Sequence, residues 1–291
     1  MFCGFSPALA TPLLGSDLTS FTVLGASTVT NVPPSTIVGD VGVWSSGGAN
    51  AITGFLSSPG VAVSDPQVTG GNVHAGTTTG TPNAMLAQAQ LTTAITNLGS
   101  LGPGTTLSLP DLVGLTLFPG VYTVPAGTTN LSGALTLDGQ GNANAAWVFQ
   151  MPSTLITSPN AVVNVINTGS GAGLYWNVGS SATIDTNTTF LGNILALTSI
   201  AMNTTATDLC GRALADTGAV TLQQNSLSGS CAGILAGSSG LSGGLDVTGT
   251  GGVVFLPDTR VNGGGTVPEP ATLALLGLGL VGFGFARRRR G

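Results

Sequence analysis

The stretch SSATIDTNTT, from Ser180 to Thr189, returns 18 residues later as TSIAMNTTAT, from Thr198 to Thr207. A second pattern, G-x-x-L-A-x-T, begins at Gly192 and again 19 residues later at Gly211. A repeat this short, with alternating β-branched residues and Gly or Asn at the corners, is typical of one coil of a β-solenoid with three short strands per coil. Such coils stack through parallel ladders about 4.8 Å apart.

Alternation within this repeat assigns side chains to the inside or the outside of each coil. Ala182 and Ile184 are predicted to stack with Ile200 and Met202 in the core. The intervening residues are small and polar and are predicted to face outward: Ser181, Thr183, Asp185, Ser199, Ala201 and Asn203. Upstream, short β-type runs separated by Gly, Pro or Asn indicate irregular coils of the same stack. The predicted fold is mainly β, an irregular parallel β-solenoid.

One segment breaks the β pattern. A helix is predicted over residues 82–98, with Thr81 as N-cap, Pro82 in the first helical position and Gly99 closing it. Its apolar stripe contains Ala84, Ala87, Leu91, Ile95 and Leu98. Because this stripe needs an apolar partner, we expect the helix to lie along one face of the solenoid.

The composition restricts the possible partners. The chain of 291 residues is 42% hydrophobic but only 6% charged, and it contains no Lys. Four of its six basic residues are clustered at the C-terminal end, so the body holds only Arg212 and Arg260 against ten Asp. Binding of nucleic acid requires clustered basic residues, which argues against that partner.

The C-terminal residues, VPEPATLALLGLGLVGFGFARRRRG, combine three features in order. Pro268, Glu269 and Pro270 are followed by an apolar run at 271–286 and by four Arg. The run predicts a hydrophobic membrane-stop helix with the Arg cluster on the cytoplasmic side. This segment resembles the PEP-CTERM sorting signal of Gram-negative bacteria. The resemblance implies transient anchoring in the inner membrane, cleavage by an exosortase-type enzyme, and delivery to the cell surface or the extracellular space.

The N-terminus and the cysteines are consistent with export. Residues 1–10 end in Ala8-Leu9-Ala10, an A-x-A pattern. They are either the remnant of a signal peptide or a frayed terminus. Cys210 and Cys231 either form one disulfide in an oxidising compartment or are two unrelated buried thiols. We expect a solenoid domain at 11–231, a Gly/Ser-rich linker at 232–266 with a possible strand at 252–256, and the sorting signal at 267–291.

Several blocks carry a likeness to a known family over residues 18–228. They are FTVLGASTVTN from Phe21, GDVGVW from Gly39, GNVHAG from Gly71, LFPGVYTV from Leu117, LTLDGQGNANAAWVFQM from Leu135, YWNVGSSATI from Tyr175, FLGNILALTSI from Phe190 and GRALADTGAVTL from Gly211. Together they resemble the bacterial and fungal ice-binding-like domain of cold-adapted antifreeze proteins. The resemblance implies a right-handed solenoid with a long helix beside it, and adsorption to ice through one flat face.

The candidate ice contacts are hydroxyl and amide side chains of the repeat. The T-x-x-T turns at Thr186–Thr189 and Thr204–Thr207 resemble the T-G-x-T element of the family, but Asn187 and Thr205 replace its glycine. The alternative is that these residues are ordinary β-formers at solvent-exposed corners. The complete candidate set is Thr183, Thr186, Thr189, Ser199, Thr204, Thr207, Thr221 and Asn225.

Two other functional classes compete with ice binding. An enzyme of the β-helix type would need clustered carboxylates, which the scattered Asp do not offer, and His74 with Asp65 and a Ser gives only a weak triad. Asp40, Asp138 and Asp185 are better interpreted as turn formers. The chain is therefore predicted to be no enzyme and to need no metal or cofactor. The main alternative is a structural or adhesive protein of the exopolysaccharide matrix.

Overall fold

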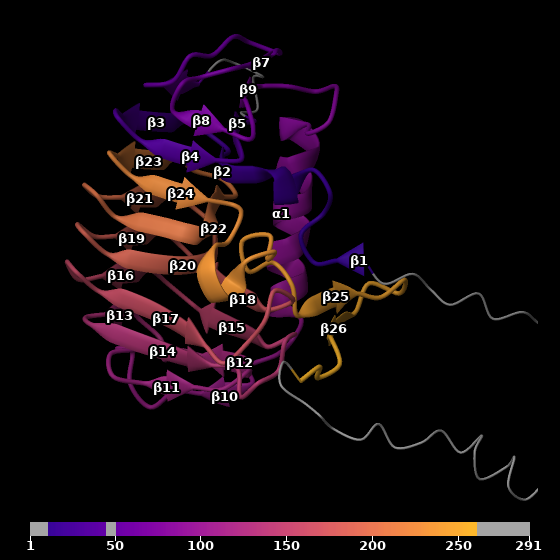
Figure 1. The fold of residues 1–291 in the computed structure, drawn as a ribbon, viewed down its shortest axis with the longest axis vertical. Coiled ribbons are helices and arrows are strands. Elements are labelled where there is room, and N and C mark those ends of the chain that lie inside the picture. The colour runs from indigo at the N-terminus through magenta and orange to yellow at the C-terminus, as the bar shows by residue number, and fades with distance from the viewer. Residues whose placement is uncertain (1–10, 45–50, 261–291) are drawn as a thin grey trace, which may run out of the picture. The chain divides into compact units, whose positions relative to one another are not determined.

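The computed structural model describes residues 11–44 and 51–260. They form a stack of three-sided coils in which nearly every strand pairs in parallel with the equivalent part of the coil above and below (Figure 1). We call the three sides the first, second and third face. The prediction of a mainly β, solenoid-like fold with one helix packed alongside is confirmed.

Each face is a row of short strands that follow one another along the stack. The first face consists of β13 (Thr129–Leu131), β16 (Leu155–Thr157), β19 (Ala182–Ile184), β21 (Ile200–Met202), β23 (Val220–Gln223), β3 (Val29–Val32) and β6 (Ile52–Thr53). The second face consists of β11 (Thr116–Leu117), β14 (Ala134–Asp138), β17 (Val162–Ile166), the starts of β20 (Thr189–Ala196) and β22 (Thr207–Ala215), β24 (Ser226–Ser228), β4 (Thr36–Val38) and β8 (Val68–Thr69). The third face consists of β10 (Thr105–Thr106), β12 (Gly120–Thr123), β15 (Ala146–Met151), β18 (Gly173–Val178), the ends of β20 and β22, β2 (Phe21–Gly25), β5 (Asp40–Val43), β9 (Val73–Ala75) and the antiparallel β7 (Ala62–Val63).

The coils do not follow one another in chain order. β2 pairs with β22, β3 with β23 and β4 with β24. The N-terminal coil therefore lies directly on a coil that the chain forms about 190 residues later, as the pairing of Val23 with Ala213 shows. We call this junction the seam. Figure 1 shows helix α1 (Ala84–Gly99) running along the stack between the indigo N-terminal coils and the magenta coils that begin with β10.

The predicted alternation of side chains holds in the best repeat. Ala182 is paired with Ile200 and Ile184 with Met202, and all four side chains are buried. A ladder of aromatic rings fills the core of the neighbouring coils: Phe149 stacks on Trp176 with ring centroids 4.4 Å apart, and Trp176 packs against the tilted ring of Phe190 at 4.9 Å. The coils are therefore held by a continuous apolar interior, which needs no surface charge to be stable.

Helix α1 buries the predicted stripe against the third face. Ala84, Ala87, Leu91 and Leu98 are fully buried, and Ile95 packs at the edge of the same cluster. The start of the helix differs from the prediction by two residues. Asn83, not Thr81, is the N-cap, because its side-chain oxygen accepts the N–H of Leu86 at 3.1 Å. None of the described helices is both apolar enough and long enough to span a bilayer.

Residues 231–260 differ from the predicted linker, and we call them the strap. They contain the 3-10 helix η2 (Gly233–Leu235) and the strands β25 (Leu245–Val247) and β26 (Val253–Phe255). β25 pairs with β26 and with the N-terminal strand β1 (Thr11–Pro12), which precedes the 3-10 helix η1 (Leu18–Ser20). Leu235, Leu241 and Leu245 are buried against the solenoid. The high Gly/Ser content of this segment predicted a flexible linker. The burial of these leucines instead holds the strap against the solenoid.

The two ends of the chain, for which the sequence also made predictions, are not among the described residues. The predicted signal-peptide remnant at 1–10 and the sorting signal with Pro268, Glu269 and Pro270 lie outside the described residues.

Candidate functional site

The second face carries an unbroken column of hydroxyl side chains. Thr189 is paired with Thr207, Thr207 with Ser226, and Ser226 with Thr36. Thr189 and Thr36 are exposed, and Thr207 and Ser226 are half-buried. We call these four residues the hydroxyl column. Because parallel strands are about 4.8 Å apart, the column presents one hydroxyl group per coil at a nearly constant spacing.

The corner between the first and second faces extends this pattern by a second row. Thr186 and Thr204 occupy equivalent positions there, and the N–H of Asn187 donates to the carbonyl of Thr204 at 3.2 Å. Asn187 has a φ of 58° and Thr205 a φ of 61°. Thr205 is β-branched, so this left-handed conformation is unfavourable for it. Its hydroxyl lies within hydrogen-bond distance of two acceptors, the Thr204 carbonyl at 2.6 Å and the Asn187 side-chain oxygen, and the contact with Asn187 keeps the corner in register with the coil below.

The first face also presents threonines, but less continuously. Its central outward positions are, in register, Thr183, Ala201, Thr221, Thr30 and Thr53. In the adjacent column the chain uses its own hydroxyls internally, because Ser181 Oγ accepts the N–H of Ser199 at 3.3 Å and Ser199 Oγ accepts the N–H of Ala219 at 3.1 Å.

The two faces also differ in charge. Asp185 lies at the corner end of the first face and accepts a hydrogen bond from Asn203 Nδ2 at 2.8 Å. This bond, together with the N–H of Thr186, lowers the pKa of Asp185, so the first face ends in a carboxylate at neutral pH. In the four coils of the hydroxyl column, the described outward positions of the second face carry no charge, and Leu209 beside the column is 51% exposed. The second face is thus the more neutral of the two.

The eight predicted contacts do not share one face. Thr189 and Thr207 lie on the second face, Thr186 and Thr204 on the corner, and Thr183, Ser199 and Thr221 on the first face.

The prediction that Asn225 contacts ice at the surface is wrong, because its side chain is fully buried. Its Nδ2 donates to the carbonyls of Asn203 at 2.8 Å and Ala206 at 3.0 Å, which holds the turn together from inside. Ser226 and Thr36 were not among the predicted contacts, and Thr36 joins the hydroxyl column only through the seam.

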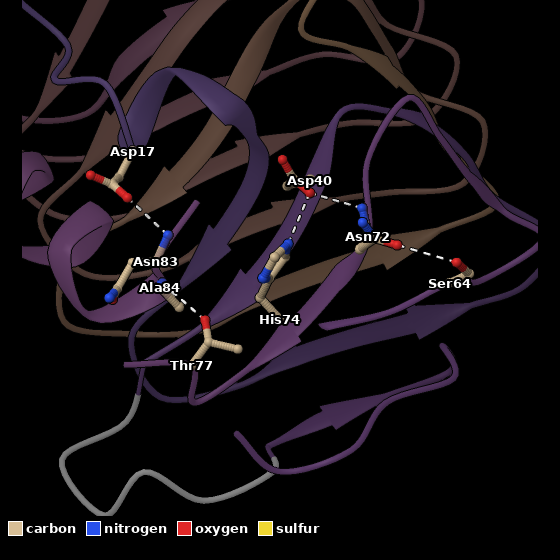
Figure 2. A network of polar contacts seen from close by, with 8 residues as sticks. All are labelled: Asp17, Asp40, Ser64, Asn72, His74, Thr77, Asn83 and Ala84. Atoms are coloured by element: carbon tan, nitrogen blue, oxygen red, sulfur yellow. Dashed lines mark hydrogen bonds and ion pairs between the residues drawn. The ribbon is translucent and has the colours of Figure 1, made fainter. Parts of the chain in front are cut away.

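The only histidine of the sequence belongs to a buried structural network. Figure 2 shows His74 pointing at Asp40, with 2.9 Å between His74 Nε2 and Asp40 Oδ1 and a second bond from the N–H of Asn72 to the same oxygen. Both side chains of the pair are more than 90% buried. Asp65, the other member of the triad that the sequence argued against, instead accepts the backbone N–H groups of Leu56 and Gln67. A triad of His74 with Asp65 is therefore contradicted.

Arg212 is the centre of a second buried network. Its guanidinium donates to the carbonyl of Thr19 at 2.6 Å, to Asn193 Oδ1 at 2.9 Å and to the carbonyl and hydroxyl of Ser239 at 3.0 Å. The network joins the N-terminal segment, the central coil and the strap. Because Arg212 is fully buried, its charge is not available to a ligand at the surface.

Asp208 is an inward-facing carboxyl on the same strand. Burial raises its pKa to about 8, and neighbouring N–H groups and the charge of Arg212 offset this only in part. Neither carboxyl oxygen has a hydrogen-bond partner of good geometry within the part of the chain that the structure describes. Over residues 11–44 and 51–260, no three His, Cys, Asp or Glu side chains lie close enough together to hold a metal ion.

Cys210 and Cys231 form a disulfide, which confirms one of the two interpretations of the sequence.

Comparison with known proteins gives a consistent result. Residues 23–228 match the Ice-binding-like family, and residues 266–290 match the PEP-CTERM protein-sorting motif. An ice-binding protein of Nostoc sp. (strain HG1) is 40% identical over 286 residues, which cover 97% of this chain and 89% of that protein. An ice-binding protein from an Antarctic biological consortium has a similar crystal structure, with a TM-score of 0.62, 32% identity, and coverage of 78% of this chain and 96% of that one. A domain of Shewanella frigidimarina ice-binding protein 1 is similar with a TM-score of 0.66, 28% identity, and coverage of 77% and 98%.

Proposed function

The chain belongs to the ice-binding-like family, and from this premise we propose that it adsorbs to ice through the second face of its solenoid. The observation that carries the proposal is the hydroxyl column of Thr189, Thr207, Ser226 and Thr36, which is in register over four coils and lies on a face whose described outward positions carry no charge in those coils. Thr186 and Thr204 add a second row at the corner.

The chemistry of ice favours such a surface. Ice presents a regular lattice of oxygen atoms without net charge, so a protein gains little from Lys or Glu and more from ordered hydroxyl and methyl groups. Thr supplies both, and its β-branched side chain has few rotamers to lose on adsorption. Along a strand, outward neighbours are about 6.6 Å apart, and along the stack they repeat at about 4.8 Å. This two-dimensional grid can order water before it meets the ice front.

Growth inhibition follows from many weak contacts acting together. A rigid stack holds its hydroxyl groups in place through the apolar core, so adsorption orders few new bonds. Ice advancing between adsorbed molecules becomes curved, and the curvature opposes further growth or recrystallisation. Adsorption requires no covalent bond to be broken, and we propose that the protein acts without catalysis.

The sorting motif supports a location outside the cytoplasm. We propose that the chain is exported, is anchored transiently in the inner membrane through the C-terminal hydrophobic helix, and is processed by an exosortase-type enzyme. It then reaches the cell surface or the matrix, where exopolysaccharide is a further partner. The right-handed sense of the coils belongs to the same proposal, because parallel crossover connections are almost always right-handed.

Matched substitutions on the two faces test the choice of surface. Thr189→Tyr with Thr207→Tyr places two bulky rings on the hydroxyl column, and Thr183→Tyr with Thr221→Tyr does the same on the first face. Ice crystals grown in dilute full-length protein are observed for faceting and thermal hysteresis, and each variant is checked for an unchanged melting temperature. We expect loss of faceting for the second-face pair only.

The other outcomes have definite meanings. Loss of faceting confined to the first-face variant would place the ice-binding surface on the first face. Faceting and thermal hysteresis equal to those of the unmodified protein in both variants would refute both assignments. Rounded crystals with the unmodified protein would overturn ice binding and favour the structural matrix protein.

A further inference from the structure

The disulfide closes a covalent ring around one complete coil. Cys210 lies on β22 where the strand turns from the second to the third face, and Cys231 is the first residue of the strap. Between them the chain passes along the third face at 211–215, the first face in β23 and the second face in β24. The separation of 21 residues is therefore one turn of the solenoid and a short closing segment.

This ring is the coil on which the seam is built. Its strands pair with the N-terminal coil through β2, β3 and β4 and with the preceding coil through β20 and β21. Loss of this coil would therefore separate the N-terminal coils from the rest of the stack. The ring contains Ser226 of the proposed ice surface, and Thr207 lies on the same strand as Cys210, just before it.

The strap beyond Cys231 is held by weaker, non-covalent contacts. Arg212 binds the carbonyls of Ser239 and Gly240, Asn193 Nδ2 binds the carbonyl of Leu241 at 2.8 Å, and the Tyr175 hydroxyl binds the carbonyl of Ser242 at 2.6 Å. The strap pairs with the parallel stack by isolated bridges, and its strands β25 and β26 form a separate antiparallel sheet with β1. These contacts can be broken one after another from the C-terminal end.

We propose that the Cys210–Cys231 disulfide is a mechanical stop that carries load from the C-terminus into the centre of the solenoid. Tension on the chain beyond Arg260 first peels away the strap. At Cys231 the load crosses the disulfide into β22, whose loaded residues Thr207 and Asp208 are paired with β20 on one side and β24 on the other. The load therefore does not pass through residues 211–230, the coil inside the disulfide ring, and this coil stays folded. The biological use of this stop rests on the proposed function, in which the processed chain is held at the cell surface or in the matrix by its C-terminal side while the second face holds ice.

Without the disulfide, tension would continue through the chain into β24 and β23. Each is a strand of only three or four residues, and each is paired within the stack. Their removal would open the seam and disrupt the hydroxyl column, so a tethered molecule would lose its binding surface when it is pulled.

Single-molecule pulling on the full chain tests the stop without any ice. One handle is attached at the C-terminus and the other at an azide-bearing amino acid introduced at Thr189. The oxidised protein should release the 29 residues that follow Cys231 in the described strap, which is an extension of about 100 Å, and then resist until the solenoid fails at higher force. The same molecule after addition of a reductant should release about 70 Å more in the low-force range, because the 20 residues inside the ring are freed.

A variant without the disulfide serves as the control for the pulling experiment. The Cys210→Ala, Cys231→Ala variant should behave as the reduced protein and should not respond to reductant. Equal extensions before and after reduction, or release beyond the strap in the oxidised protein, would overturn the proposal. Because the assay contains no ice, failure of the stop is independent of failure of ice binding.

Discussion

Replacement of Arg212 by Met should destabilise the protein far more than the same change at Arg260. The Arg212 guanidinium is fully buried and donates to acceptors from three parts of the chain: Thr19, Asn193 and Ser239. Met fills much of the volume but offers no donor, so these buried acceptors lose their partners. Each buried acceptor that is left without a partner costs about 1–3 kcal/mol of unfolding free energy.

Arg260 is a matched control because it is the other arginine of the described chain. Its side chain is exposed, and its Nη2 lies 3.4 Å from Asp258 Oδ2. Because such surface ion pairs contribute little, Arg260→Met should change the free energy of unfolding by no more than about 0.5 kcal/mol. Urea unfolding can be followed by the fluorescence of Trp147 and Trp176, both fully buried. A loss below about 1 kcal/mol for Arg212→Met, or one no larger than the control, would refute the role of Arg212 as a clamp.

Two further results are expected. Because the pKa of Asp208 is raised to about 8 in the folded chain and is about 3.9 when unfolded, its contribution makes the protein most stable below about pH 4 and less stable as the pH rises to 8. Asp208→Asn should remove this component, so its stability relative to the unmodified protein should rise by up to about 5 kcal/mol between pH 4 and 8, and an unchanged difference would contradict the burial argument. Reduction of Cys210–Cys231, which closes a loop of 21 residues, should lower the unfolding free energy by about 3 kcal/mol in urea titrations. The Cys210→Ala, Cys231→Ala variant should not respond to the reductant.

The repeat predicted the local fold because its information is local. An 18-residue period with alternating apolar positions allows few arrangements other than stacked coils, and the pairing of Ala182 with Ile200 follows directly from it. The helix was equally visible, since its stripe and its end at Gly99 are encoded in consecutive residues. Its start was predicted two residues early because Thr81 and Asn83 are both good N-caps and only contacts with Asp17 and Thr77 decide between them.

The seam and the strap could not be predicted because they depend on contacts between distant parts of the chain. Nothing in the local sequence of Thr36 indicates that it will stand beside Ser226. The same limit explains Asn225, whose exposure was predicted from its place in the repeat. A shorter turn in that coil places its side chain inside, where it bonds to the carbonyls of the coil below.

The seam also determines where the chain ends leave the described domain. β1 and β25 lie on the helix-covered side, with Leu13, Leu14 and Leu245 in the same apolar cluster as α1. The last described residues return to the turn between the second and third faces, where Arg260 bridges Asn142. The hydroxyl column belongs to another face of the same coils. The described chain therefore ends beside the turn that follows β14, two coils from Thr189, and the hydroxyl column itself stays open. A chain that followed the simple order of its repeats would end in a terminal coil, where tension would pull directly on an edge strand of the stack.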